Sequence, residues 1–301
     1  MQIEDIANRV HGSRELPAFS STGQKLLKMI ADPNSTMQRI AAVVAMDPPL
    51  AASIMRLANS AAYGFSERTH DLGMAITRLG LRMLKTLVVS SSILRNVDNM
   101  GKLASLDRKG YWRFCLAAAI ASRLVANRDK PLLGDDAFLI GLLHGLGVTV
   151  LDVFFPEVLH NALDRVGLES LPLRDAIQKS TGIGLGRIGA VLLREWQLDD
   201  TLVEALAATD SETRDMTADV AQRVHYVRVG ISLARAAGIG KPIDIKPPES
   251  CPNIAAWAEA ARRLGESMEA ARVAPENLEE LVEQVKRDFG FFLGLAGEKA
   301  A

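Results

Sequence analysis

Histidine and cysteine are the side chains that most often hold transition metals, and their spacing in this chain argues against a metal motif. No two of the five histidines are four residues apart, the spacing that places two imidazoles on one helix face. The histidines are His11, His70, His144, His160 and His225. The two cysteines, Cys115 and Cys251, give neither zinc-type spacing nor a disulfide framework. The local sequence therefore predicts no metal site.

Residues Gly184 to Gly189 match the GxGxxG pattern of dinucleotide-binding folds letter for letter. That pattern binds phosphate where it follows a strand and opens a helix. The preceding residues, 175–181, predict a polar helix instead, and no acidic ribose ligand follows a second strand. We interpret the glycines as a flexible helix start that allows close helix packing. An anion site at the exposed amides beside Arg187 is the alternative.

Three further clusters have structural explanations. Ser90–Ser92 lacks a nucleophile elbow and predicts a small-residue helix face. Asp135 and Asp136 are interpreted as a helix cap with favourable first-turn charge. One helical stretch is basic but has no interleaved aromatic residues for base stacking, which favours a solvated face over a nucleic-acid surface. Its basic residues are Arg78, Arg82, Lys85 and Arg95.

The elements that must position these residues are helices. Apolar residues recur with helical periodicity along the chain, without strand alternation, and this predicts an all-α fold. Residues Ser35–Gln38 read as a capping box with Ser35 at the cap. Asp47 is predicted to cap the helix that begins at Pro48, and Asp71 a helix that Gly80 ends.

Composition limits the classes of function. The chain has 301 residues, 48% of them hydrophobic, which is enough for a sizeable core. A net charge of −1 predicts no broad attraction to nucleic acid or to an anionic membrane. The longest apolar run, Leu142 to Phe155, is interrupted by polar residues and glycines, so no membrane-spanning helix is predicted. Residues 1–5 lack the pattern of a signal peptide, and we expect a cytoplasmic protein.

Several segments together resemble the HDOD (HD-related output domain) family, above all LANSAAYG and AITRLG. The segments are Leu16–Pro17, Asp47–Leu50, Arg56–Gly64, Ala75–Gly80, Gly141–Gly147 and Gly189–Leu198. The resemblance implies a multi-helix fold in which a helical subdomain particular to the family precedes a degenerate HD-phosphohydrolase-like subdomain. The predicted division is an N-terminal arm (1–13), an HDOD domain (14–240, divided into 14–105 and 106–240) and a proline-containing linker with a helical extension (241–301).

The resemblance also allows each metal-ligand position of the HD enzymes to be compared with this sequence. The His-Asp doublet falls on His144 and Gly145, so the aspartate is missing. The remaining ligand positions fall on Phe114, Leu185, Thr209–Asp210 and, approximately, Ile231. Only His144 is retained, with Asp210 as an accidental oxygen. The resemblance therefore implies a vestigial histidine, no metal and no cofactor.

The function implied by the resemblance is that of a non-catalytic bacterial signal-transduction module. It would act on signalling proteins of unknown identity, or bind a small ligand, with a link to cyclic-dinucleotide pathways because family members occur joined to such domains. No receiver or diguanylate cyclase signature is recognised, so we expect a stand-alone member, with no membrane or nucleic-acid partner. The predicted partner surface is Asp47, Arg56, Asn59 and Tyr63. Helix-end and turn roles are the alternative for Asn59 and its neighbour Ser60.

Two other functions remain alternatives. The first is a residual metal-dependent phosphohydrolase that uses His144 with Asp210. The second is a nucleotide or nucleic-acid binding module that uses the glycine-rich helix start. Metal content, turnover and salt-dependent binding would separate these possibilities.

Overall fold

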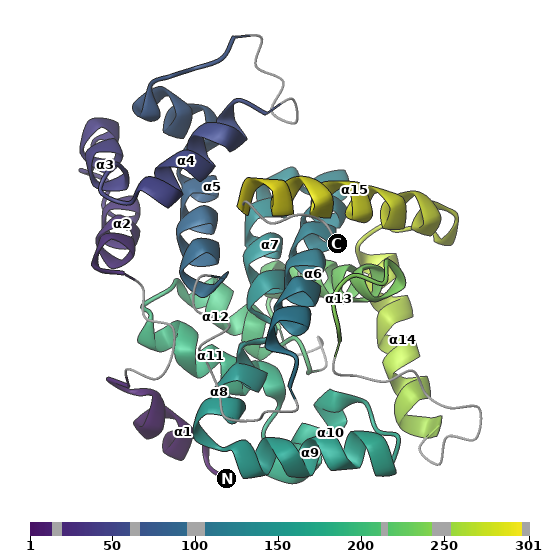
Figure 1. Cartoon of the computed structure of the whole chain (residues 1–301). Coiled ribbons are helices and arrows are strands. Elements are labelled where there is room, and N and C mark those ends of the chain that lie inside the picture. Colours follow the sequence, from purple (N-terminus) through teal and green to yellow (C-terminus); the bar gives the residue numbers. More distant parts are fainter. Residues whose placement is uncertain (14–19, 61–66, 95–105, 212–215, 243–253, 297–301) are drawn as a thin grey trace. The chain divides into compact units, whose positions relative to one another are not determined.

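A computed structural model describes residues 1–13, 20–60, 67–94, 106–211, 216–242 and 254–296. These residues form helices and turns and contain no strand, which confirms the predicted all-α fold (Figure 1). The chain divides into two compact units. The first comprises residues 1–16 and 97–287, and the second residues 17–96 and 288–301.

The second unit is built from four helices and the end of α15. Their bounds are α2 (Ser21–Ala31), α3 (Met37–Val44), α4 (Pro48–Ala58), α5 (Leu72–Leu94) and α15 (Leu278–Ala296), of which residues 288–296 belong here. Its core contains Leu26, Ile40, Ile54 and Ile76, each fully buried. Phe289 of α15 is buried as well, which agrees with an extension that packs within the chain.

In the second unit, the residues that the sequence predicted as caps stand at the starts of their helices, with one exception. Asp47 caps α4 by accepting the Leu50 amide at 3.1 Å, and Asp71 accepts the Met74 amide at 2.6 Å. Gly80 interrupts α5 with φ 80° and ψ 160°, a conformation that suits glycine.

The predicted capping box at Ser35–Gln38 is wrong. Thr36, one residue later, caps α3 by accepting the Arg39 amide at 3.3 Å. Ser35 belongs to the preceding turn, where its amide donates to the Asp32 carbonyl at 3.0 Å.

The first unit contains the other helices. Their bounds are α1 (Ile3–Val10), α6 (Arg108–Asp129), α7 (Gly134–Leu143), α8 (Leu146–Phe154), α9 (Pro156–Leu168), α10 (Leu173–Thr181), α11 (Leu185–Glu195), α12 (Asp200–Ala207), α13 (Ala218–Ala236), α14 (Ile254–Ala270) and α15 up to Arg287, with 3₁₀ turns at Pro131–Leu133 and Pro275–Asn277. Helices α6, α7 and α13 pack against one another at its centre (Figure 1).

Two glycines allow this central packing. A Cβ atom at Gly141 of α7 would lie 2.9 Å from the Ala119 Cα of α6, and one at Gly230 of α13 would lie 2.6 Å from the Ser122 amide nitrogen. Real side chains do not approach a backbone so closely. Helices α7 and α13 can therefore contact α6 from two sides only because these positions lack side chains.

The apolar stretch around α7 and α8 is longer than the sequence analysis allowed. Pro131–Phe154, 24 residues, is apolar and long enough to cross a membrane, so the expectation that no such run exists is wrong. In the structure, 94% of its most apolar window is buried, and the stretch is divided between α7 and α8 around His144. It forms core of the first unit.

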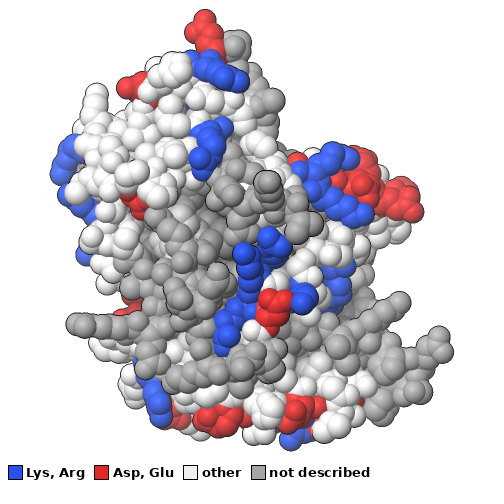
Figure 2. All heavy atoms as spheres, viewed as in Figure 1, with Lys and Arg blue, Asp and Glu red and all other residues white. Residues whose placement is uncertain are grey.

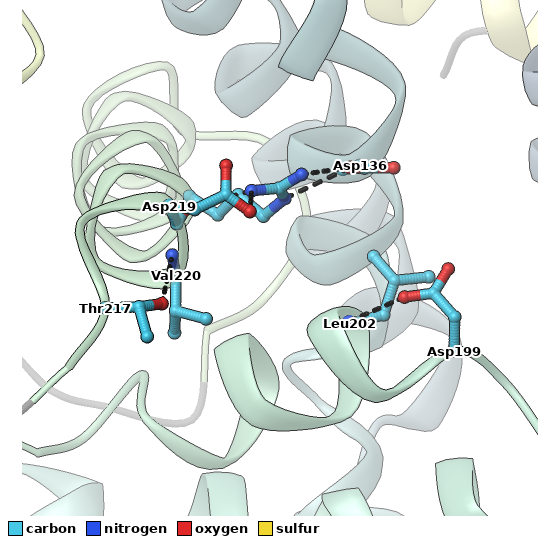
Figure 3. Close-up of polar contacts among 7 residues, drawn as sticks. Asp136, Asp199, Leu202, Thr217, Asp219 and Val220 are labelled. Atoms are coloured by element: carbon cyan, nitrogen blue, oxygen red, sulfur yellow. Dashed lines mark hydrogen bonds and ion pairs between the residues drawn. The ribbon is translucent and has the colours of Figure 1, made fainter.

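Buried ion pairs join helices of this unit. Asp152 of α8, 2% exposed, accepts two hydrogen bonds from Arg108 of α6, at 2.7 and 3.1 Å. Arg223 of α13 lies between Asp136 of α7, 2.9 Å away, and Asp219 one turn before it. Figure 3 shows both carboxylates, with the caps of α12 and α13 nearby.

This pairing corrects the interpretation of the acidic doublet. Asp135 and Asp136 do not cap α7, which begins at Gly134 without a side-chain cap. Asp136 pairs with Arg223, and Asp135 lies 3.3 Å from Arg123 of α6. The first-turn placement was predicted correctly, but the partners lie on two other helices, the preceding α6 and the distant α13.

Candidate functional site

A cavity of about 330 Å³ lies within the first unit. Helices α6, α10, α11, α13 and α14 and the segments after α7 and α12 contribute to its wall. One part of the wall is apolar: Tyr111, Phe114, Pro172, Leu173, Leu185, Ile231, Pro242 and Leu264. The other part is polar or charged: His144, Arg174, Thr209, Asp210, Arg228, Ser232, Arg235 and Arg263.

The positions matched to HD metal ligands lie together in this cavity. They are Phe114, His144, Leu185, Thr209, Asp210 and Ile231. The rings of Phe114 and His144 meet edge to face, with centroids 5.7 Å apart. The structure thus brings the six positions to one place, and three of them, Phe114, Leu185 and Ile231, carry hydrocarbon side chains that cannot coordinate a metal.

Gly145, the position of the missing aspartate, is closed off by its neighbours. A Cβ atom there would lie 2.6 Å from the Cys115 Sγ and 2.9 Å from Cε1 of Tyr111. A larger residue fits at this position only if the side chains of Cys115 and Tyr111 shift. Burial raises the pKa of the Cys115 thiol, so this side chain is a neutral packing group.

His144 is held by the backbone of α7. Its Nδ1 lies 2.6 Å from the Gly141 carbonyl, which can only accept, so Nδ1 carries the proton. A hydrogen bond of this kind orients the ring whether or not a metal is bound.

Asp210 is bound to the glycine-rich helix start. Its Oδ2 accepts the Gly186 amide at 2.6 Å, at the first turn of α11. Burial raises the pKa of the Asp210 carboxyl, against the Gly186 hydrogen bond and the positive charges of Arg174 and Arg228. This carboxylate occupies the helix start that the sequence left open as an anion site.

The glycine-rich segment itself serves helix packing, as the sequence predicted. It follows helix α10 and not a strand. A Cβ atom at Gly186 would overlap the Leu206 carbonyl, and one at Gly189 would lie 3.0 Å from the Gly147 amide nitrogen. The glycines bring α11 close to α8 and to the end of α12.

Four arginines of the cavity were missed by the sequence analysis. Arg228 and Arg235 lie on α13 with Ile231 and Ser232 between them, in the i, i+3, i+4, i+7 pattern of one helix face. That pattern was visible in the sequence. Arg174 and Arg263 come from α10 and α14, and no local pattern connects them with α13.

The residues of this cavity do not fit a divalent metal ion. A catalytic metal needs several converging nitrogen or oxygen ligands and an open position. Here one imidazole and one carboxylate share the wall with four guanidinium groups, which would repel a cation. Among the described residues, no three His, Cys, Asp or Glu side chains form a group that could hold a metal.

The residues predicted for a partner surface lie in the second unit and differ in exposure. Asp47 is buried and serves as the α4 cap. Asn59 binds the backbone of Thr69 in both directions, at 2.9 and 2.8 Å, which is a structural role. Arg56 is exposed on α4. Tyr63 lies outside the described residues, as does Cys251.

The serine cluster lies within α5 and bonds to the backbone of that helix. Ser90 Oγ donates to the Thr86 carbonyl at 2.7 Å, and Ser92 Oγ to the Val88 carbonyl at 2.8 Å. These are the bonds of serines that point back along their own helix. On the face drawn in Figure 2, basic and acidic side chains both occur, as a net charge of −1 leads one to expect.

Comparison with known families gives the assignment. The HDOD domain matches residues 16–212 of this chain. The chain belongs to the HDOD family. The match includes His144, Gly145, Leu185, Thr209 and Asp210, and it ends before Arg228, Arg235 and Arg263 of the cavity wall.

Solved structures share this HDOD fold at low sequence identity. An HDOD domain protein of unknown function from Geobacter sulfurreducens has a TM-score of 0.66 and 20% identity, covering 95% of this chain and 98% of its own. A candidate phosphohydrolase from Shewanella amazonensis has a TM-score of 0.65 and 21% identity, covering 98% of both chains.

A relative of uncharacterized function from Treponema pallidum is 27% identical over 206 residues. The match takes in 67% of this chain but only 38% of that relative, so the chain corresponds to well under half of its length.

Proposed function

We propose that this HDOD chain is a non-catalytic regulatory module that acts through binding, and not a metal-dependent phosphohydrolase. The observation that carries the proposal is that the cavity holds few side chains able to bind a metal, together with four arginines in its wall. His144 and Asp210 remain, while Phe114, Leu185 and Ile231 place hydrocarbon at other ligand positions. A hydrolytic site needs a metal-bound water, and this wall offers too few ligands to hold the metal.

The charge of the wall supports the same conclusion. Arg174, Arg228, Arg235 and Arg263 line the cavity, against the single carboxylate of Asp210. Burial favours the neutral form of that carboxyl, because it raises its pKa. A dication would therefore meet net positive charge where the HD enzymes present aspartates.

Metal content and turnover test this proposal on the full chain. We expect no stoichiometric manganese, iron, zinc or magnesium in the purified protein. We also expect no phosphate release from nucleotides or cyclic dinucleotides when these metals are added. Tightly bound metal together with a turnover that His144→Ala abolishes would overturn the proposal. His160→Ala is the matched control, because His160 is exposed on α9 and outside the cavity.

We propose the exposed part of α4 as the partner surface, with signalling proteins of the cytoplasm as partners. Among the members of the predicted set that the structure describes, Arg56 is exposed, while Asp47 and Asn59 hold the local fold. In affinity capture from native cells, Arg56→Glu should lose partners that the wild type retains. Arg39→Glu, exposed on α3, should retain them. Equal capture by all three proteins would remove α4 from the proposal.

A further inference from the structure

We propose that the cavity of the first unit binds a small organic anion, whose phosphate or carboxylate group contacts the arginines and whose body lies on the apolar wall. The inference deepens the proposed function, because it names the class of ligand that a non-catalytic HDOD pocket would sense. It rests on the cavity wall, on the hydrogen bonds that hold the arginines and on the size of the space.

The arginines give the cavity its selectivity for anions. Arg174, Arg228, Arg235 and Arg263 reach it from three different helices, α10, α13 and α14. Guanidinium groups bind phosphate and carboxylate oxygens through paired N–H donors, and they keep their charge at any physiological pH. Arg174 is already paired with Asp175, whose carboxylate lies 3.3 Å from its Nε. A bound anion would add negative charge beside the four guanidinium groups.

Two of these guanidinium groups are held in place by the backbone that follows α12. Arg228 donates through Nε to the Thr209 carbonyl at 3.0 Å, and through Nη2 to the Ser211 carbonyl. Arg263 donates through Nη1 to the Asp210 carbonyl at 2.8 Å. Carbonyl oxygens are neutral, so these bonds orient the groups and leave their charge. An arginine positioned before binding loses little side-chain entropy when the anion arrives.

Asp210 is a weak internal competitor for the arginines. Its Oδ2 already accepts the Gly186 amide at 2.6 Å. Burial raises the pKa of this carboxyl, with the nearby Asp175 acting in the same direction and Arg174 and Arg228 against it. Because Oδ2 of Asp210 is already engaged by the Gly186 amide, the arginines keep donors that an anion can use.

The apolar wall and the volume show that the ligand is more than an inorganic ion. Phe114 and Leu185 are buried side chains whose surfaces face the cavity, and Leu173 and Ile231 extend that wall. The volume, about 330 Å³, is at the lower end of the range for small-molecule pockets, roughly 300–1,000 Å³. A ligand with one charged group and one compact apolar or aromatic part fits both halves of the wall.

Calorimetric titration of the full chain tests the inference. The probes are adenosine 5′-monophosphate and benzoate, each compared with its uncharged counterpart, adenosine or benzyl alcohol. Inorganic phosphate is titrated alone. We expect at least one organic anion to bind saturably, more tightly than its uncharged counterpart and more tightly than inorganic phosphate. The larger gain over the uncharged counterpart shows whether the cavity favours the phosphate or the carboxylate group.

Substitutions then assign the binding to this cavity. Arg235→Gln and Arg174→Gln should each lower the affinity for the anion by about tenfold, because each removes one charge-assisted contact. Arg194→Gln is the matched control, because Arg194 is exposed on α11 and outside the cavity wall. Unfolding midpoints, followed by tryptophan fluorescence, exclude variants that do not fold. Anion binding that neither cavity variant weakens would overturn the inference, as would no preference for the charged probes.

Failure of this inference can be told apart from failure of the proposed function. If the anion binds but is hydrolysed by metal-loaded protein, the regulatory proposal fails while the ligand class stands. If no anion binds and no turnover occurs, the non-catalytic module stands without this ligand.

Discussion

Gly145 lies directly against Cys115, so closely that a Cβ atom on the glycine would stand 2.6 Å from the cysteine Sγ. In the HD enzymes the same position carries an aspartate that helps to hold the metal. Here the space for that side chain is filled by α6. A side chain added at Gly145 would therefore have to displace the side chains of Cys115 and Tyr111.

Gly145→Ala should lower the free energy of unfolding by about 1–3 kcal/mol, because the added methyl overpacks the contact with Cys115 and Tyr111. Cys115→Ala makes room next to it. In a double-mutant cycle measured by urea unfolding, the double variant should lose less than the sum of the single variants. If the losses in the free energy of unfolding were strictly additive, the two side chains would not compete for the same space. All three tryptophans, at positions 112, 196 and 257, belong to the first unit, so their fluorescence follows this transition.

Gly230→Ala should cost about 3 kcal/mol or more, because its Cβ would lie 2.6 Å from the Ser122 amide nitrogen, and backbone cannot move aside cheaply. Gly265→Ala is the matched control. That glycine lies within α14, and among the described residues no neighbouring atom comes within 4 Å of the place where its methyl group would stand. Alanine should therefore stabilise the helix there by about 0.5–1 kcal/mol. In urea unfolding, the change in the free energy of unfolding should have opposite signs for the two variants. Destabilisation of equal size at both sites would contradict the close approach of α13 to α6.

Asp152→Ala should destabilise the first unit by about 3 kcal/mol, since it leaves the guanidinium of Arg108 without its carboxylate partner between α6 and α8. The exposed pair of Arg262 and Glu266 on α14 gives the comparison. Arg262→Ala should change stability by less than about 1 kcal/mol, because solvent screens an exposed pair. A small effect at Asp152 would mean that water reaches Arg108 when the partner is removed.

Asp210→Asn should change how stability depends on pH. The folded-state pKa of Asp210 is raised above the ordinary carboxyl value of 3.8, chiefly by burial. The folded protein therefore binds this proton more tightly than the unfolded chain, and the wild type loses stability as pH rises from the ordinary to the raised pKa. Asparagine can still accept the Gly186 amide but has no such loss.

The free energy of unfolding of the variant should therefore rise relative to that of the wild type as pH rises through that interval. Above the interval the difference between the two proteins should stay constant. Urea unfolding at a series of pH values measures this. Glu204→Gln, exposed on α12, should track the wild type throughout. A variant that instead loses stability toward neutral pH would show that Asp210 is stabilised as a carboxylate.

The sequence by itself determined the helical class, because period, caps and glycine breaks are local: Asp47, Asp71 and Gly80 act where the sequence placed them. Through the family resemblance it also predicted that Gly145, Leu185 and Thr209 stand at positions where the HD enzymes hold a metal, and this stays a prediction. The local cap prediction failed at Ser35, because Ser35 belongs to the preceding turn and its amide donates to the Asp32 carbonyl there.

Only the tertiary structure decided what the ligand positions became. In the folded chain, Asp136 forms an ion pair with Arg223, 87 residues away in the sequence. The Asp210 carboxylate accepts the Gly186 amide at the glycine-rich helix start. The tertiary structure also brought Arg174 and Arg263 from separate helices to the stripe on α13 that holds Arg228 and Arg235. Such convergence depends on how helices far apart in sequence pack, and hydrophobic packing sets that arrangement without leaving a local pattern in the chain.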